Sequence, residues 1–510
     1  MPLFDLNQLE NLSPKQYDFT VIGAGAAGIL LAVKLSEQGF KINIVESGHF
    51  FEDDERQSLN EIIHKSKYLN TAVWGRKRAL GGTTIAWGGQ SLPFSKLDFE
   101  KRDWITNSGW PITFEEVAKY YPEANRFMGI ESDEYYDSML EKIGLLKAKP
   151  VGEELIYHVS KWTKTPNLYD LYKKKLHRDV DIYYNAQLTQ IEKKGDRITA
   201  IQLNNFKAKE FKLTVNTLII AAGGIESVRI LQLSSLSTSK SLGLGFMEHP
   251  CIEFGVVQNY RPYHLQRLFN THFYKGQKQS LRLSLSEKHQ KSKEILNASV
   301  SLLFEYPETG LNPYQEIKFF LKEPKVTKLS KVLKSSGYMV STLCSYLVND
   351  FLYKPKSIPK LNMMLEQEAT SESRIFLSNE LDQFGKQKAA IDWRISDLTW
   401  KTFLEGARST EKVFKENNLG EAIIYPFLNE NATNVNEYFS GVNHHMGGTK
   451  MGNKIENGVV NTDLKLWDYE NAFICSSSVF PTSSHSNPTL TLLALACRLS
   501  KFLTAKNKNR

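Results

Sequence analysis

Cysteine is scarce in this chain of 510 residues, which contains only Cys251, Cys344, Cys475 and Cys497. No two of them form a C-x-x-C pair, so the sequence offers neither a disulfide framework nor the ligand spacing of a zinc site. We therefore predict free thiols in a reducing compartment and no bound metal.

Long hydrophobic runs are absent as well. The longest apolar window, residues 337–353, contains Asn349 and Asp350 and is too short to span a bilayer. The opening residues, MPLFDLNQLENLSPKQ, lack the basic stretch and apolar core of a secretory signal. We therefore predict a cytoplasmic protein without membrane association.

A large excess of one charge is also missing, because 64 Lys and Arg against 56 Asp and Glu leave a formal net charge of +8. Without helix-turn-helix, zinc-finger or RNA-binding signatures, so mild an excess gives no reason to expect nucleic acid as a partner. Lysines do recur at spacings of three and four between Lys318 and Lys334. This stripe is compatible with docking of an acidic partner, an anionic substrate or a membrane surface, but a solvated helix face is the simpler interpretation.

What the chain does contain, near its N-terminus, is the pattern of a dinucleotide site. An apolar run, residues 17–22, leads into Gly23-x-Gly25-x-x-Gly28 and a helical pattern, and the next apolar run ends at Glu46. Gly23 permits a tight turn, Gly25 lets the backbone approach a pyrophosphate, and Gly28 lets the helix pack on the strand. Glu46 stands where a carboxylate would accept hydrogen bonds from a ribose, which disfavours the 2′-phosphate of NADP. The motif alone does not separate NAD from FAD.

Three further segments narrow the choice. Residues 78–89 form a second Gly-rich loop, whose paired glycines suit close backbone approach to a large ligand. Residues 182–220 alternate polar and apolar side chains, which predicts a small antiparallel meander that ends in a buried strand. Near the C-terminus, HHMGGTKMG begins at His444, and NPTLTLLALA opens an apolar helix at Asn487.

Together these pieces resemble the glucose–methanol–choline (GMC) oxidoreductases, a family of FAD flavoproteins. The matching stretches occur in the family's order over nearly the whole chain: GAGAAG with Glu46, GGTTIAWGG, SGWPI, AAGGIESVRIL, GFMEHP, HHMGGTKMG and SSSVFPT with NPTLTLLALA. The style of the last motifs is similar to the branch with pyranose oxidase and glucoside dehydrogenases. Residues 256–429 match more loosely, and there we expect substrate recognition.

The expected fold class is α/β, with two domains, since a single core seldom grows beyond about 250–300 residues. We expect a Rossmann-like FAD-binding domain, a parallel sheet with helices plus the small meander, built from residues 1–100, 165–255 and 430–510. A discontinuous α+β substrate-binding domain with a mostly antiparallel sheet is expected from residues 101–164 and 256–429.

The resemblance also implies which residues hold the cofactor. In several sugar-oxidising relatives a histidine of the second Gly-rich loop is linked covalently to the flavin, but this chain has Ala86 there, so we expect non-covalent FAD. The amides of Thr489 and Leu490, at the start of the C-terminal helix, would stabilise negative charge on the reduced flavin. The expected contacts are Gly23, Gly25, Ala26, Ala27, Gly28, Glu46, Gly81, Gly82, Thr83, Thr84, Trp87, Gly88, Gly89, Leu188, Ala222, Gly223, Ser478, Pro488, Thr489 and Leu490.

Two residues are expected to carry the chemistry. The family pattern H-x-x-G-T places the general base at His445, with Asn487 as the amide that orients the substrate oxygen. We expect His444 to point away or to support the site, because adjacent residues in extended chain face opposite sides. Asn487 before Pro488 is also a good helix N-cap, and an amide used for capping could not hold substrate; Ser486 is an alternative cap.

The resulting hypothesis is FAD-dependent oxidation of an alcohol on a sugar, glycoside or polyol, with hydride transfer to flavin N5. The electron acceptor, whether oxygen, a quinone or a protein, stays open, and a dehydrogenase is slightly favoured over an oxidase. The alternatives are an FAD-containing lyase of the same fold, a GMC dehydrogenase for a non-sugar alcohol, an NAD-linked dehydrogenase, and a non-catalytic flavin subunit.

Overall fold

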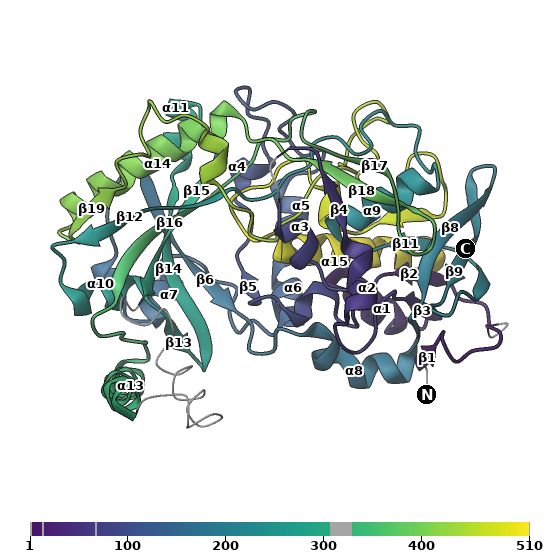
Figure 1. Cartoon of the computed structure of the whole chain (residues 1–510), viewed down its shortest axis with the longest axis horizontal. Coiled ribbons are helices and arrows are strands. Elements are labelled where there is room, and N and C mark those ends of the chain that lie inside the picture. Colours follow the sequence, from purple (N-terminus) through teal and green to yellow (C-terminus); the bar gives the residue numbers. More distant parts are fainter. Residues whose placement is uncertain (1–2, 13–14, 67–68, 306–328, 509–510) are drawn as a thin grey trace.

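A parallel sheet and an antiparallel sheet lie in opposite halves of the molecule (Figure 1). The structure is a computed structural model and describes residues 3–12, 15–66, 69–305 and 329–508, with backbone only for 329–335. The predicted lysine stripe between Lys318 and Lys334 therefore lies outside the residues whose side chains are described. No helix of the described residues combines the length and the apolar character needed to cross a bilayer.

The parallel sheet has six strands drawn from three distant parts of the chain. Its order is β1 (Leu3–Asp5), β7 (Val180–Tyr184), β3 (Ile42–Val45), β2 (Phe19–Ile22), β11 (Leu218–Ile220) and β20 (Ala472–Ile474). All four residues of β2 and of β3 are buried, as is usual for strands covered on both faces. The sheet thus joins the dinucleotide motif to the C-terminal segment.

Helices pack around the parallel sheet in this half. The Gly-rich turn leads into α1 (Ala26–Ser36), which packs against α15 (Pro488–Lys508) and α8 (Leu168–Asp179). A further helix, α9 (Gly223–Leu233), follows β11. The predicted meander is confirmed as an antiparallel sheet of β8 (Gln187–Lys194), β9 (Arg197–Asn204) and β10 (Glu210–Thr214).

The antiparallel sheet forms the core of the other half. Its order is β19 (Glu421–Ile424), β12 (Cys251–Gln258), β16 (Ile358–Leu365), β15 (Ala298–Glu305), β14 (Gln277–Leu285), β6 (Leu155–Trp162) and β5 (Gln90–Ser91), and β13 (His272–Tyr274) pairs with β14. Apolar side chains on one face pack against α14 (Asp397–Glu416) and α10 (Pro262–Phe269). The α/β class with parallel and antiparallel sheets is confirmed.

A third sheet shows how closely the two halves are interwoven. It consists of β17 (Arg374–Leu381), β18 (Gln387–Asp392) and β4 (Ile62–His64). Here β18, from the expected substrate-binding domain, pairs with β4 from the expected FAD-binding domain. Likewise β5, expected in the FAD-binding domain, pairs with β6 of the antiparallel sheet. The boundaries at residues 100, 164, 255 and 429 stay predictions.

The other helices are short, except α13, and cover the edges of the two halves. They are α2 (Asp54–Gln57), α3 (Thr71–Trp74), α4 (Lys96–Phe99), α5 (Phe114–Ala118), α6 (Tyr121–Met128), α7 (Asp137–Lys142), α11 (Glu287–Lys293) and α13 (Leu329–Asn349). Short 3₁₀ turns occur at Ser58–Asn60, Gly82–Ile85, Leu146–Ala148, Val435–Tyr438 and Ser477–Val479.

Candidate active site

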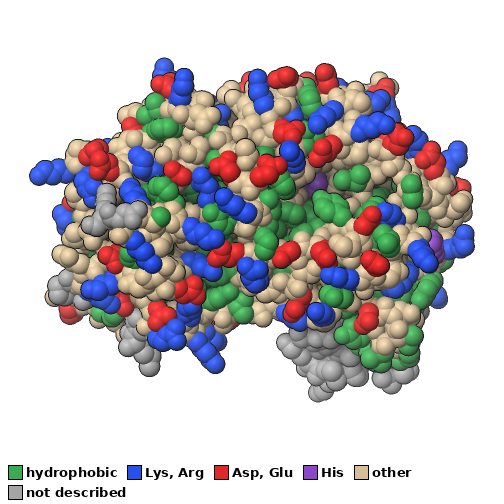
Figure 2. Space-filling model, turned by 180° about the vertical axis from the view of Figure 1, so that it is seen from behind, with side chains coloured by type: hydrophobic (Ala, Val, Ile, Leu, Met, Phe, Trp, Pro, Cys, Tyr) green, Lys and Arg blue, Asp and Glu red, His purple; other side chains and the backbone are tan. Residues whose placement is uncertain are grey.

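A cavity of about 670 Å³ lies between the two halves and is lined by residues of both. The Gly-rich turns, the starts of α9 and α15, and the polar face of the antiparallel sheet all contribute to its walls. The view from behind in Figure 2 shows a hollow near the middle of that face, with hydrophobic side chains inside it and acidic and basic side chains mixed around its rim. The size and mixed lining are typical of a cofactor or ligand site.

In the first Gly-rich turn, Gly23 and Gly28 are required by the fold, whereas Gly25 faces the cavity. At Gly23, with φ of +100°, a Cβ would lie 2.7 Å from the carbonyl oxygen of Ala221, and at Gly28 it would lie 2.0 Å from the carbonyl oxygen of Gly23. A Cβ at Gly25 would meet nothing within 4 Å, and Gly25 lines the cavity. Gly25 is also the N-cap of α1, and no side chain there caps the helix. The first N–H groups of α1 therefore face this open space. The turn therefore fits a pyrophosphate, as expected for FAD.

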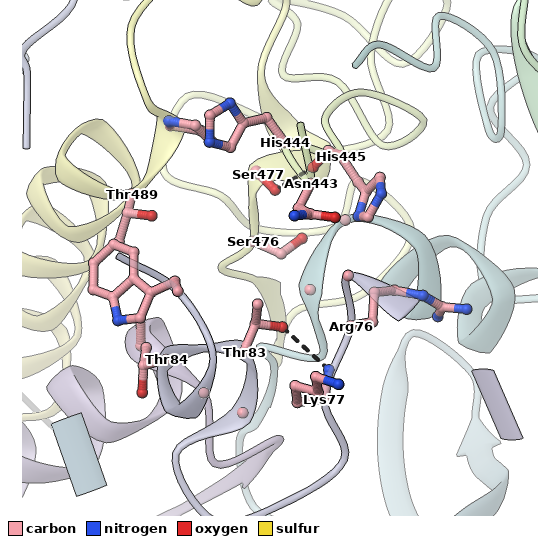
Figure 3. A pocket seen from close by; sticks show the side chains of 18 of the residues that line it. Arg76, Lys77, Thr83, Thr84, Asn443, His444, His445, Ser476, Ser477 and Thr489 are labelled. Atoms are coloured by element: carbon pink, nitrogen blue, oxygen red, sulfur yellow. Dashed lines mark hydrogen bonds between the residues drawn. The ribbon is translucent and has the colours of Figure 1, made fainter. Parts of the chain in front are cut away.

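The second Gly-rich loop closes on the first. A Cβ at Gly82, where φ is +53°, would lie 2.8 Å from the Cα of Gly25, so the two backbones touch at the cavity wall. Thr83 lines the cavity, and its hydroxyl accepts a hydrogen bond from the N–H of Lys77 (Figure 3). Gly81 faces the side chain of Asn167 instead. The loop thus presents mainly backbone and hydroxyl groups to a ligand.

Glu46 lines the cavity, but the fold already uses its carboxylate. One oxygen accepts the N–H of Ala24 and the other accepts the N–H of Gly48, both at 2.8 Å. Burial raises the pKa of this carboxyl, while the two backbone N–H groups oppose that rise. Glu46 therefore holds the Gly-rich turn against the end of β3, and its expected contact with a ribose stays a prediction.

Most of the predicted cofactor residues meet at this one cavity. Those that line it are Gly23, Gly25, Ala26, Ala27, Glu46, Gly82, Thr83, Thr84, Trp87, Gly88, Gly89, Leu188, Ala222, Gly223, Pro488 and Thr489. Gly28, Gly81, Ser478 and Leu490 are not part of its lining. The Ser478 hydroxyl is buried against Thr449 at 2.6 Å, while the neighbouring Ser476 and Ser477 line the cavity in its place. The cofactor contact predicted for Ser478 stays a prediction.

The histidine pair gives the cavity its most distinctive contact. Figure 3 shows the two rings pointing apart, His444 toward the start of α15 and His445 toward the side of Arg76. His444 Nε2 lies 2.9 Å from Nδ2 of Asn487, and His444 Nδ1 lies 2.8 Å from Nδ1 of His249. The structure therefore joins Asn487 to His444, whereas the sequence pattern paired it with His445. The contact of His249 was not anticipated, although the matched stretch GFMEHP contains this residue.

The hydrogen-bond partners determine which nitrogen carries each proton. His249 Nε2 lies 3.1 Å from the carbonyl oxygen of Ser483, which can only accept, so this nitrogen bears the hydrogen. Burial lowers the pKa of His249 to about 4, so at neutral pH its Nδ1 is bare and accepts from Nδ1–H of His444. His444 Nε2 is then left with a lone pair, which the amide N–H of Asn487 meets. The chain of contacts thus aims a basic nitrogen at the cavity.

His445 has different surroundings. Its ring stacks against Phe246, and Nε2 lies 3.4 Å from a carboxylate oxygen of Glu248 without a hydrogen-bond partner among the described residues. Burial, with a smaller contribution from Arg76, lowers the pKa of His445 to about 3, and burial raises that of Glu248 to about 7. His445 is therefore neutral at pH 7, and its role as base stays a prediction that no contact with Asn487 supports.

Asn487 does not spend its described contacts on capping. Its Nδ2 donates to His444, and its Oδ1 is buried without a hydrogen-bond partner among the described residues. The neighbouring Ser486 hydroxyl donates to the carbonyl of Pro93, so it does not cap the helix through that bond either. An unsatisfied buried amide oxygen at a cavity wall is a position where a ligand gains a hydrogen bond.

For the wall opposite the Gly-rich turns, the sequence indicated only the segment 256–429 and not the individual residues. It is the polar face of the antiparallel sheet, which contributes Cys251, Arg282, Ser301, Leu303, Asn362 and Met364. All of these lie within or beside the segment where substrate recognition was expected. Strand alternation could have marked them as one face, but only the assembled sheet shows that this face looks at the cavity.

Two family models match separate parts of the chain. A family model described as GMC oxidoreductase matches residues 369–496, and one described as pyridine nucleotide-disulphide oxidoreductase matches residues 17–244. The chain is 20% identical to a 2-methyl-1,2-propanediol dehydrogenase of Mycolicibacterium austroafricanum over 97% of this chain and 96% of that protein. It is 26% identical to a C-glycoside 3-oxidase of Arthrobacter globiformis over 30% of this chain and 28% of that protein.

Solved structures share the fold. A formate oxidase of Aspergillus oryzae superposes with a TM-score of 0.59 and 14% identity over 98% of this chain and 100% of its own. At such low identity the likeness concerns the fold alone.

Buried histidines make the protein without its cofactor sensitive to acid. Burial lowers the pKa of His249, His272 and His485 to about 4 and that of His445 to about 3, and it lowers those of His158 and His444 well below 6.5. Between pH 6.5 and 4 the unfolded chain binds more protons than the folded protein does. The free energy of unfolding therefore falls as the pH falls. Glu46 and Glu248, whose pKa values are raised, act in the opposite direction but are two groups against six.

We therefore expect the melting temperature of the cofactor-free protein to drop steeply between pH 6.5 and 4. His272 lies in the other half of the molecule and contributes up to about 3 kcal/mol of this loss, because its pKa falls from 6.5 to about 4. His272→Gln should make the pH dependence of thermal unfolding shallower. A dependence that is unchanged in this variant, or that rises toward acid, would contradict the prediction.

Proposed function

Because the chain belongs to the GMC oxidoreductase family and binds FAD, we propose that it oxidises an alcohol group of a sugar, glycoside or polyol. The observation that carries the proposal is the contact between His444 and Asn487 at the wall of the cavity. The family supports oxidation of a CH–OH donor, and the site's own geometry supports how the hydroxyl would be held.

A hydroxyl can be held and deprotonated by these two side chains together. His444 Nε2 and Asn487 Nδ2 are 2.9 Å apart, so one oxygen placed beside both can lie within hydrogen-bond reach of each. We propose that the substrate oxygen accepts from the Asn487 amide, while its hydrogen replaces the amide N–H at the lone pair of His444. We therefore propose His444 as the general base in place of His445, and Asn487 as the residue that orients the alcohol.

The rest of the chain prepares this base. His249 accepts from His444 Nδ1–H, so the ring keeps the tautomer that can take a proton, and the new imidazolium keeps its hydrogen bond. Burial lowers the pKa of His444, so the ring is unprotonated and ready at neutral pH. When bound, FAD supplies the acceptor for the two electrons that leave the carbinol carbon together with its hydrogen. The alcohol thereby becomes a carbonyl compound.

The choice of a sugar-like substrate is supported by relatives. The C-glycoside 3-oxidase and a 6'''-hydroxyparomomycin C oxidase are named for sugar-bearing substrates, although each matches only part of this chain. The full-length relative is named a dehydrogenase of a small diol. We favour a polyhydroxylated substrate and a dehydrogenase, with an electron acceptor other than oxygen.

An anaerobic screen tests the activity. Mixing the flavin-loaded protein with glucose, methyl glucosides or polyols should bleach the visible absorption of oxidised flavin, and a dye should then accept the electrons faster than oxygen does. Bleaching only by simple non-sugar alcohols would show that the substrate is not a sugar, glycoside or polyol. An absence of bleaching by every alcohol would favour a lyase of the same fold.

Matched variants test which histidine is the base. His444→Asn should slow flavin reduction by about 10²- to 10⁴-fold, the usual contribution of a general base, whereas His445→Asn should cause a much smaller loss. Rapid-mixing absorbance measures both, and the flavin content of each variant shows that the cofactor is still bound. A large loss in the His445 variant with a nearly intact His444 variant would return the base to His445.

We also propose that FAD is held without a covalent bond. The loop residue where some relatives carry a linking histidine is Ala86, which lines the cavity and offers no nucleophile. Acid denaturation should therefore release all of the flavin into the supernatant, as measured by its fluorescence. Flavin that stays with the precipitated protein would point to a covalent link through another side chain.

A further inference from the structure

One wall of the cavity carries a cation that the protein leaves unpaired. Along β14, Leu281 and Leu283 point into the core beneath α14, so Arg282 between them lies on the opposite face of the sheet. On that face Arg282 lines the cavity together with Ser301 from the neighbouring strand β15 and Asn362 from β16, the strand beyond it. The arginine is therefore directed at the space in which a substrate would bind.

The guanidinium of Arg282 has no ion pair and no hydrogen-bond acceptor among the described residues, and its Nε is buried. The indole ring of Trp162 lies 5.6 Å from its central carbon. Burial lowers the pKa of Arg282 to about 10, so the group stays protonated at neutral pH. A guanidinium offers five N–H donors, and here they face the cavity without a partner.

Two fully buried arginines are paired with carboxylates, whereas the half-buried Arg282 has no such partner among the described residues. Arg102 makes two hydrogen bonds, of 2.8 and 2.5 Å, with the carboxylate of Glu366, and Arg229 lies 2.5 Å from Asp382. Leaving a buried charge without a partner is strongly unfavourable, which is why such charges are normally paired. The exception at Arg282 indicates that the missing anion comes from a ligand.

No carboxylate on the cavity wall is free to supply that anion. Glu46 and Glu226 are the acidic residues of the lining, and both belong to the half that holds the Gly-rich turns. Glu46 accepts backbone N–H groups, and Glu226 is paired with Arg229 at 2.9 Å. The pyrophosphate of FAD is not the partner either, because its place is at Gly25, in the half of the molecule opposite β14 (Figure 1).

We propose that the alcohol substrate carries an anionic group, a carboxylate or a phosphate, which binds Arg282 while its hydroxyl lies at His444 and Asn487. The inference rests on the proposed function, because it uses the same cavity and the same base. A guanidinium suits this task, since its planar fork matches two oxygens of either anion. Arg282 also faces the reacting end of the cavity, where its charge acts on the His444 ring.

Three matched sugars test the proposal with the flavin-loaded enzyme: glucose, glucuronate and glucose 6-phosphate. We expect kcat/KM for at least one anionic sugar to exceed that for glucose about tenfold or more, as a charge-assisted hydrogen bond allows. A preference for glucuronate would identify a carboxylate, and one for glucose 6-phosphate would identify a phosphate. Equal values for all three would overturn the proposal while leaving sugar oxidation intact.

Arg282→Gln should lower kcat/KM for the preferred anionic sugar about 10- to 100-fold, mainly through KM, and change that for glucose much less. Lys278→Gln is the matched control. It removes a positive charge from the same face of β14, where Lys278 lies over the Trp162 ring at 4.4 Å, but Lys278 is not part of the cavity lining. We expect the control to retain its preference for the anion. Equal losses for charged and neutral sugars in the Arg282 variant would contradict a role in anion recognition.

Thermal unfolding provides a readout that does not depend on turnover. Inorganic phosphate or acetate should raise the melting temperature of the flavin-loaded wild-type protein but not that of Arg282→Gln, because binding to the native state stabilises it. The variant without added anion should be no less stable than the wild type, since an unpaired buried charge is lost. If no sugar reduces the flavin but the anions still stabilise only the wild type, the sugar assignment fails and the anion site stands. Equal stabilisation of both proteins would overturn the anion site.

Discussion

The contact between His249 and His444 depends on the buried carboxyl group of Glu248. One of its oxygens accepts the backbone N–H of His249 at 2.8 Å and that of His444 at 2.7 Å, and the other accepts the hydroxyl of Thr71 at 3.2 Å. Next to it, Met247 and Met446 exchange backbone hydrogen bonds. Segments almost two hundred residues apart are thereby locked side by side. Because this carboxylate binds the backbone N–H groups of His249 and His444, it fixes the positions from which both rings extend. The two rings are thereby placed in contact.

The two walls of the cavity differ in physical kind. The wall built on the parallel sheet offers backbone groups, hydroxyls and helix starts, which suit a large cofactor with phosphates and a ribityl chain. The wall built on the antiparallel sheet offers side chains, including a thiol, an amide and the unpaired Arg282. Backbone groups change little with mutation, whereas side chains on a sheet face can change one at a time. We therefore expect separate parts of the chain to recognise the cofactor and the substrate.

Some of this site could be predicted from local pattern, and some could not. The structural roles of Gly23 and Gly28 could be predicted because each depends on local backbone geometry. Gly23 has a positive φ, and Gly28 leaves no room for a Cβ. The histidine pair was harder. The motif favoured His445, but the ring that reaches Asn487 belongs to His444, because the backbone bond to Glu248 and the ring contact with His249 orient it. The residues of the HHMGGT stretch alone do not predict the contact with Glu248 or the contact with His249.

The sequence by itself determined the α/β class, the dinucleotide turn, the FAD flavoprotein family and the two segments that meet at the reacting end, because these follow from periodicity, glycine spacing and ordered motifs. Only the tertiary structure decided which histidine faces the amide, which serines of the 476–478 turn line the cavity, and that Arg282 has no counter-ion among the described residues. Those outcomes depend on contacts between residues 29 to more than 200 positions apart, which fix a side chain's direction and its partners. A local pattern carries no information about either.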